Sequence, residues 1–409
     1  MAFSVSFWGG CLDGLMGGLS RVRWLKSHVI LSERYHMSHL GTSKYTDKTR
    51  KGPLHSAIGD KAESLRESGG HAWTGKVSHA MKHLVLFLLV TLSACSSREV
   101  LVVYSPHGRD MLIDYEVLFE QANPGVDVQW LDMVSQDVYN RISAERKRPA
   151  CDVWWGAPST MFMQAAEEGL LEEYTPSWAE RVNASYKDPD NFWYGTQVTP
   201  LAIMFNDRQY TRETVPQTWD DLLAPEWEKK ITIRKPMRSG TMRTFISAMI
   251  LRAESEDDGV EWLEKLHLAT ADYMETPQLL FDHIKRREQL ITVWLMSDAV
   301  FQRDKHGYPF GFLLPPKTPV LTEGIALVRG ARNPDLARKF YEFVTTSEAL
   351  VQQAQDHAKI PARNDIDKSA LPQWMVEQPI DPMPIDWKEF AENEQRWCDR
   401  WEREVFESP

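Results

Sequence analysis

Short apolar segments alternate with helical segments from residue 98 onward, and this alternation restricts the possible folds more than any other feature. The runs EVLVVYS, VDVQWLD and CDVWWG are rich in valine and aromatic residues, which is typical of buried strands. Between them, apolar residues recur with helical spacing. Strand and helix units in series predict an α/β fold with a parallel sheet, whose ligand-binding edge lies at the carboxyl ends of the strands. The expected elements of this part are 99–105, 110–122, 126–132, 135–147, 151–156 and 159–169.

A second set of units begins near residue 200, after the apolar run TPLAIMFND. The chain then returns through YPFGFLLPP to a strand at 323–330 and a helix at 333–346, and it ends in an amphipathic helix at 385–405. Two sets of units joined by extended segments near residues 200 and 310 predict two lobes. The second set is expected to comprise strands at 231–233 and 290–295 and helices at 241–252, 257–268, 277–287 and 297–306. The expected parts are a first lobe at 95–198, a second lobe at 199–308, a return to the first lobe at 309–358, and C-terminal helices at 359–409 that pack back on the hinge and the second lobe.

The segment MKHLVLFLLVTLSACSS, residues 81–97, is organised like an export signal, although it lies well inside the sequence. Two basic residues precede an apolar run at 84–92, which is much shorter than the roughly 20 residues that span a bilayer. The following LSAC resembles the lipobox of bacterial lipoproteins, in which the cysteine carries diacylglycerol and becomes the N-terminus. We therefore interpret 81–94 as a lipoprotein signal peptide and Cys95 as the lipidation site. A buried core segment with an incidental cysteine is the alternative.

Residues 1–80 differ in charge from the rest of the chain. They hold 11 Lys+Arg and 6 Asp+Glu, whereas the remaining residues hold 36 and 52. We hypothesise that residues 1–80 are an unstructured extension created by a start codon assigned too early, and a genuine extension is the alternative. The acidic balance of the remainder argues against nucleic acid as a partner, because nucleic acid requires a basic surface. Beyond Cys95 the sequence has no other long apolar segment, so we expect contact with the membrane only through the lipid.

Two further cysteines, Cys151 and Cys398, lie in the part that would be exported. An oxidising compartment permits a disulfide bond between them. Two separate buried thiols are the other outcome, and the sequence leaves both open.

Four segments carry a family resemblance: LVVYSPHG, CDVWWGAPSTMFMQAAEEGLLEEY, TWDDLLAPEWEKKITIRKPMRSGTMRTFISAMI and GIALVRGARNPDLARKFYEFVTTSEA. Their order and spacing over residues 98–365 resemble a bacterial extracellular solute-binding protein, and within that class the ferric-ion, phosphonate and sugar-phosphate receptors of ABC importers. The resemblance implies a two-lobed type II periplasmic-binding fold with hinge strands and an interlobe ligand cleft. It also implies a monomeric, lipid-anchored periplasmic receptor that delivers a small organic anion (phosphonate, sugar phosphate or carboxylate) to an inner-membrane permease. A ligand sensor of the same fold that feeds a signalling system is an alternative function.

The motif RKPMRSGTMRTF, residues 234–245, is the leading candidate for anion binding. A strand ends there, and Ser239, Gly240 and Thr241 open a helix whose N-terminal N–H groups and partial positive charge attract anions. Arg238 can add charge-assisted hydrogen bonds. We predict that these four residues bind the anionic group of the ligand. The alternative is that Ser239 or Thr241 only caps the helix.

Loops at the ends of other expected strands supply further candidate ligand-binding residues. Alternation along a strand places Trp154 and Trp155 on opposite faces, and we assign Trp155 to the cleft. Glu275 together with Asp298 would suit an amine on the ligand, whereas Thr276 is equally well explained as a helix cap. The candidates from these loops are Ser105, His107, Arg109, Trp155, Ser159, Glu275, Thr276 and Asp298, with Glu323 as a weaker one.

The ferric receptors that this chain resembles coordinate iron largely through two adjacent tyrosines after a strand of the second lobe. In the matching stretch ITVWLMSDAVFQ, Ser297 and Asp298 occupy those positions, which argues against iron. A ferric-ion receptor nevertheless stays an alternative function. The sequence has no G-x-S-x-G, H-E-x-x-H, G-x-x-x-x-G-K-[ST] or C-x-x-C motif, so we predict a protein that is not an enzyme and has no catalytic residues, cofactor or metal site.

Overall fold

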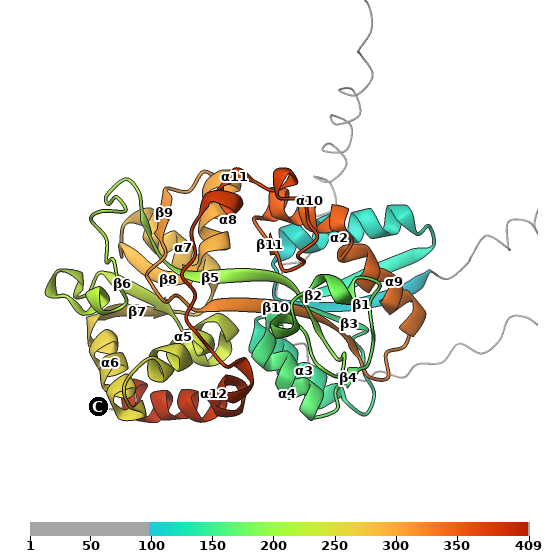
Figure 1. Cartoon of the computed structure of the whole chain (residues 1–409), viewed down its shortest axis with the longest axis horizontal. Coiled ribbons are helices and arrows are strands. Elements are labelled where there is room, and N and C mark those ends of the chain that lie inside the picture. Colours follow the sequence, from blue (N-terminus) through green and yellow to red (C-terminus); the bar gives the residue numbers. More distant parts are fainter. Residues whose placement is uncertain (1–97, 408–409) are drawn as a thin grey trace, which may run out of the picture. The chain divides into compact units, whose positions relative to one another are not determined.

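The computed structural model describes residues 98–407, which form α-helices on both faces of a mixed β-sheet (Figure 1). The described chain begins with β1 (Glu99–Ser105) and ends just after the C-terminal helix. The expected upstream extension, the signal segment and Cys95 lie outside the described residues. Within residues 98–407, no helix is both long enough and apolar enough to cross a membrane.

The sheet is parallel at both edges and antiparallel in its middle, along the order β2-β1-β3-β10-β5-β8-β6-β7. β1 pairs in parallel with β2 (Val126–Asp132) and β3 (Val153–Pro158), as the strand–helix series predicted. The expectation of a parallel sheet is wrong for β10 (Val320–Val328) and β5 (Tyr194–Asn206), which run antiparallel to their neighbours. Both strands pair with partners distant in sequence, so the local alternation could not show their direction. The remaining strands are β4 (Leu171–Glu172), β6 (Ile231–Arg234), β7 (Thr270–Met274), β8 (Ile291–Leu295), β9 (Phe310–Leu313) and β11 (Ile360–Pro361).

β5 passes through two hydrophobic cores. Its first part, from Tyr194 to Pro200, pairs with β10, and its second part, from Leu201 to Phe205, pairs with β8 and β9. The core around β1 and β3 contains residues such as Phe119 and Trp155, and we call it the first core. The core around β6, β8 and the second part of β5 is the second core. Because β10 runs beside β5, two antiparallel strands join the two cores.

Among residues 98–407, five α-helices begin at a side chain that caps the first turn. Ser239, Ser255, Thr276, Thr346 and Asp386 each accept a hydrogen bond from a backbone N–H of the turn that follows. α10 had no counterpart among the expected elements, whereas α11 falls within the C-terminal helices expected at 359–409. The helices are α2 (Arg109–Ala122), α3 (Ser135–Glu145), α4 (Ser159–Glu167), α5 (Gly240–Leu251), α6 (Glu256–Ala269), α7 (Pro277–Arg286), α8 (Met296–His306), α9 (Pro334–Val344), α10 (Ser347–His357), α11 (Gln373–Glu377) and α12 (Trp387–Trp401).

α12 is attached to the second core by both apolar and charged contacts. Trp397 and Trp401 are buried in that core. Next to Trp397, Arg396 donates to Glu256 at the start of α6, with an Nη1–Oε2 distance of 2.6 Å. Hydrogen bonds from Arg396 and from the Trp397 indole lower the pKa of Glu256 to about 2. A carboxylate at the N-terminus of α6 also interacts favourably with the helix dipole, so α12 and α6 form one packed unit.

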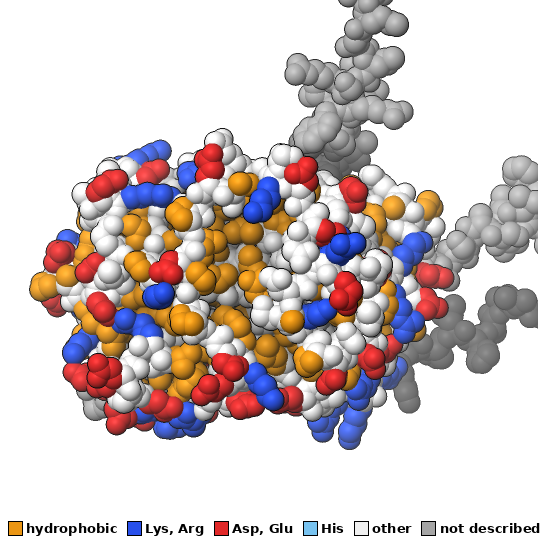
Figure 2. Space-filling model, in the orientation of Figure 1, with side chains coloured by type: hydrophobic (Ala, Val, Ile, Leu, Met, Phe, Trp, Pro, Cys, Tyr) orange, Lys and Arg blue, Asp and Glu red, His pale blue; other side chains and the backbone are white. Residues whose placement is uncertain are grey.

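Cys151 and Cys398 are both buried free thiols in the described part of the chain. Cys151 belongs to the first core, and Cys398 lies on α12 near Ser247. Of the two outcomes left open by the sequence, separate buried thiols describe this structure. Acidic and basic side chains are interspersed over the face drawn in Figure 2, so charge on that face does not gather into one patch.

Candidate ligand-binding cleft

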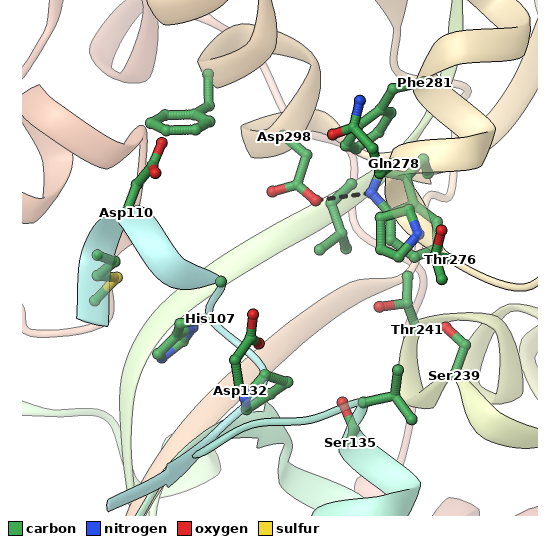
Figure 3. A pocket seen from close by; sticks show the side chains of 18 of the residues that line it. His107, Asp110, Asp132, Ser135, Ser239, Thr241, Thr276, Gln278, Phe281 and Asp298 are labelled. Carbon is green, nitrogen blue, oxygen red and sulfur yellow. Dashed lines mark hydrogen bonds between the residues drawn. The ribbon is translucent and has the colours of Figure 1, made fainter. Parts of the chain in front are cut away.

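A cavity of about 580 Å³ lies at the carboxyl ends of β1, β2, β3, β6 and β8, and residues of both cores line it. From the first core come the loop after β1 and the ends of β2 and β3, including His107, Asp132 and Pro158. From the second core come the starts of α5 and α7 and the first turns of α8. Figure 3 shows that the labelled side chains of these elements point toward a common space. The cavity therefore lies at the strand edge where α/β folds bind ligands.

Arg234 is a buried lining residue whose hydrogen-bonding capacity is only partly used. It ends β6 with only 6% of its surface exposed, and its guanidinium lies over the Trp294 ring at 5.5 Å from the centroid. Nη1 donates to the Ser239 hydroxyl at 3.5 Å, whereas Nε and Nη2 have no partner among residues 98–407. Burial, and next the charge of Arg238, lower its pKa to about 10, so Arg234 is charged at neutral pH. Because a buried cation without hydrogen bonds is costly, this site is suited to an anion.

The N-terminus of α5 lies beside Arg234 and adds further donors. Ser239 and Thr241 both line the cavity. The Ser239 hydroxyl accepts a hydrogen bond from Met242 N at 3.3 Å, so Ser239 does cap the helix, as the alternative interpretation held. The N-terminus of this twelve-residue helix carries a partial positive charge, which is favourable for an anion.

Arg238 and Gly240, the other two residues predicted at this site, do not line the cavity. Arg238 turns away and donates to Asp137 on α3, and 57% of its side chain is exposed. Gly240 instead permits close packing between helices. A Cβ atom there would lie 2.8 Å from Pro158 Cδ and 3.2 Å from Met161 Cε. Its role in this structure is thus to let α5 approach α4, rather than to let a ligand approach the backbone.

His107, Gln197 and Glu323 form a buried polar group at the junction of β5 and β10. The Gln197 amide donates to Glu323 Oε2, and His107 Nδ1 lies 3.6 Å from the same oxygen. Burial, and next the charge of Lys359, lower the pKa of His107 well below its usual value, so the imidazole is neutral. Burial raises the pKa of Glu323 above its usual value, although the positive charge of Lys359 opposes this shift. His107 and Glu323 line the cavity, so a buried carboxyl group faces the ligand space.

Of the three candidates on this side, Asp298 and Thr276 line the cavity, whereas Glu275 does not. Asp298 Oδ2 accepts a hydrogen bond from the Trp294 indole at 2.7 Å (Figure 3). Thr276 caps α7 by accepting from Leu279 N. Glu275 is exposed and pairs with Lys235, which removes it from the ligand space.

Three predicted residues near the first core lie behind the cavity wall. Trp155 belongs to the first core, where it packs edge-on against Tyr115, so its assignment to the cleft differs from the structure. Ser105 is buried and accepts a hydrogen bond from His107 N at 3.1 Å, which positions the loop that carries His107. Ser159 is buried as the first residue of α4. Arg109, by contrast, does line the cavity.

Sequence reasoning missed several polar lining residues. Arg234 lies in the motif that was singled out, directly after the predicted strand 231–233, so its position at a strand end was an available signal. Lys359 follows α10, which was not expected at all. The missed polar residues of the cavity wall are Asp110, Asp132, Ser135, Arg234, Gln278, Gln302, His306, Tyr308, His357 and Lys359.

Within the described residues, no group of three or more His, Cys, Asp or Glu side chains is arranged to hold a metal ion. Ser297 is buried and hydrogen-bonds to Thr199. It is one of the two residues that occupy the positions of the tyrosine pair of ferric receptors. Asp298 is therefore the only one of those two positions that contributes to the described cavity wall.

The sequence and the structure were compared with known proteins. A family model described as bacterial extracellular solute-binding protein matches residues 157–392. The chain is 24% identical over 322 residues to a probable ABC transporter periplasmic-binding protein of Sinorhizobium fredii, covering 75% of this chain and 87% of that relative. It is 22% identical to a putative 2-aminoethylphosphonate-binding periplasmic protein of Salmonella typhimurium, covering 71% of this chain and 87% of the relative. The solved structure of the periplasmic binding protein AfuA from Actinobacillus pleuropneumoniae, with fructose-6-phosphate bound, superimposes with a TM-score of 0.69 at 22% identity, covering 76% of this chain and all of that one.

Proposed function

Because the chain belongs to the bacterial extracellular solute-binding proteins and has their type II periplasmic-binding fold, we propose that it is the receptor of an ABC importer for a small organic anion. The anion is captured in the cavity between the two cores and is delivered to a membrane permease. The proposal depends above all on Arg234, whose buried side chain lines the cavity. Two of its nitrogens, Nε and Nη2, have no hydrogen-bond partner within residues 98–407.

The anionic group of the solute is held by Arg234, Ser239, Thr241 and the first turn of α5. The guanidinium offers a planar pair of donors that matches the oxygens of a phosphonate, phosphate or carboxylate. The relatives' names are in keeping with this chemistry, since they include a 2-aminoethylphosphonate receptor and a structure with bound fructose-6-phosphate.

The remainder of the solute lies against acidic side chains. Asp298 and the buried Glu323 both line the cavity. The negative charge of Asp298 makes ionisation of Glu323 less favourable, so further negative charge in this part of the cavity would be repelled. A solute that carries an amine or several hydroxyl groups, in addition to its anionic group, would donate hydrogen bonds to these carboxyl groups. Amino-phosphonates and sugar phosphates meet this requirement better than simple dicarboxylates do.

A solute screen tests the proposed function. The purified protein is examined by native mass spectrometry for a co-purifying compound, and by thermal shift with phosphonates, sugar phosphates, carboxylates and ferric salts. A solute at 100 times its Kd stabilises the fold by about 2.7 kcal/mol, which is readily measured. We expect an organic anion to give this shift without being chemically altered. Stabilisation by none of these anions, or turnover of the one that binds, would contradict the proposal.

Iron is expected not to be the physiological ligand. Ser297 and Asp298 replace the tyrosine pair of ferric receptors, and tyrosinate ligands give ferric complexes a visible absorption band. The purified protein should therefore stay colourless when ferric citrate is added, as measured by visible spectroscopy. A coloured complex with one iron per chain would favour the ferric alternative.

The receptor is expected to be anchored to a membrane through lipid on Cys95. This rests on the signal-like segment 81–94 and the LSAC that ends at Cys95. A Cys95→Ala variant should be released from membranes or stay unprocessed, whereas the parent protein fractionates with membranes. Equal membrane association of the two proteins would rule out the lipoprotein interpretation.

A further inference from the structure

A second group of unpartnered polar atoms lies outside the cavity, where α12 meets α4 and α5. It comprises Glu394 of α12, Thr160 of α4 and Thr244 of α5, all at least nine-tenths buried. In the described part of the chain, Glu394 Oε1 and both threonine hydroxyls have no hydrogen-bond partner within ordinary distance, and neither has Arg243 Nε. Four such atoms in one junction are unusual, because buried polar groups are nearly always satisfied.

These groups act on one another despite lacking direct hydrogen bonds. Burial raises the pKa of Glu394, while the charge of Arg243 and the hydroxyls of Thr160 and Thr244 lower it. The geometry of the junction places these groups together, because α12 packs against both α4 and α5, and Arg243 Nη2 donates to Gln395, the residue after Glu394, at 2.8 Å. A small approach of α4 toward α12, or an intervening water molecule, would complete the hydrogen bonds that the carboxylate lacks.

The junction connects the two sides of the cavity. α4 belongs to the first core, and the residue before it, Pro158, lines the cavity. α5 belongs to the second core, and Thr241 in its first turn also lines the cavity. Thr160 and Thr244 lie within one turn of these lining residues. Since α12 is attached to α6 of the second core, a contact from Glu394 to Thr160 links one core to the other.

We propose that Glu394 is a positioning residue of the cleft, which links α4 to α5 through hydrogen bonds with Thr160 and Thr244 that a small approach of the helices or a bridging water molecule completes. The contact favours the arrangement in which the N-termini of both helices face the cavity. Gly240 contributes at the same junction, since the absence of its side chain lets α5 reach Pro158. This inference rests on the proposed function only in treating the cavity as the solute site.

Hydrogen exchange measured by mass spectrometry on the solute-free protein tests the inference. In Glu394→Ala, amides of α4 and of the first turn of α5 should exchange about fivefold faster, the lower end of typical coupling between sites. Glu394→Gln keeps an acceptor oxygen and should restore most of the protection. Glu392→Ala, an exposed position on the same helix, is the matched control and should change neither α4 nor α5.

An effect confined to α12 would overturn the inference, because it would mean that Glu394 only supports its own helix. If Glu394→Ala does not fold, Thr160→Val removes the hydroxyl at nearly constant shape, and it should speed exchange in α4 and in α12 alike. Unchanged exchange in α12 of that variant would be equally decisive against the contact. Since no solute is added, a failed solute screen and a failed exchange experiment remain distinguishable.

Discussion

Replacing Arg234 by methionine is expected to lower the affinity for the organic anion by about 100-fold or more. Methionine approximates the stem of the arginine but removes every donor of the guanidinium. Each charge-assisted hydrogen bond to a buried group contributes roughly 1.5–3 kcal/mol, and Nε and Nη2 are both available within the described structure. Loss of two such bonds exceeds the roughly 2.8 kcal/mol that corresponds to 100-fold in Kd. Isothermal titration with the anion identified by the screen measures the effect.

The same variant should fold at least as stably as the parent when no solute is present. Removing an incompletely hydrogen-bonded buried cation relieves a desolvation cost, which offsets the lost contact with Trp294. A urea melt should show an unchanged or slightly higher free energy of unfolding. Arg238→Met is the matched control, because Arg238 is exposed and pairs with Asp137, and such pairs contribute about 0–1 kcal/mol. If both variants bind the anion equally well, Arg234 is not the anion-binding residue.

The two arginines illustrate what the sequence could and could not establish. The motif RKPMRSGT was correctly recognised as the end of a strand followed by a helix N-terminus, because strand and cap signals are local. Which arginine enters the cavity depends on the short 3₁₀ turn Pro236–Arg238 between them. That turn directs Arg238 toward α3, and α3 reaches this place only through the tertiary fold.

The misplacement of Trp155 has a similar cause. Alternation along a strand separates inner from outer residues only when one face of the sheet is exposed. β3 lies between neighbours with helices on both faces, and all six of its residues are buried. Trp154 and Trp155 therefore both belong to hydrophobic clusters, on opposite faces of the sheet, and neither side is solvent or ligand.

The positions of Lys359 and Glu323 could not be predicted from the sequence, because they depend on pairing between strands that are distant in the chain. Both approach the cavity because β10 and β11 pair with β5, and these strands join segments distant in the sequence. Periodicity predicts that a strand exists at 323–330, but not which strands lie beside it. That Glu323 and Lys359 lie near His107 could therefore not be predicted from the sequence.

Gly240→Asp is expected to reduce affinity for the anion by about 100-fold, for two separable reasons. The new Cβ would lie 2.8 Å from Pro158 Cδ and 3.0 Å from Pro158 Cγ, atoms of a rigid ring that cannot move aside, so α5 must shift away from α4. The new carboxylate would then repel an anion bound at the same helix N-terminus. Overpacking of this kind typically costs 1–3 kcal/mol of stability, and a urea melt should show such a loss.

Gly240→Ala separates the two reasons, because it crowds Pro158 without adding charge. It should lose the part of the stability that crowding accounts for, and its loss of affinity should be smaller, about tenfold, since only the displacement of Ser239 and Thr241 remains. Adding Pro158→Ala to the Gly240→Ala variant removes the Cδ and Cγ atoms that would crowd the new Cβ. The double variant should therefore recover part of the lost stability and part of the lost affinity. Additive effects of the two substitutions would mean that α4 and α5 do not meet at this glycine. An isolated helix would gain from aspartate in its first turn, so a loss of stability in Gly240→Asp reflects crowding across the junction and burial of the new carboxylate.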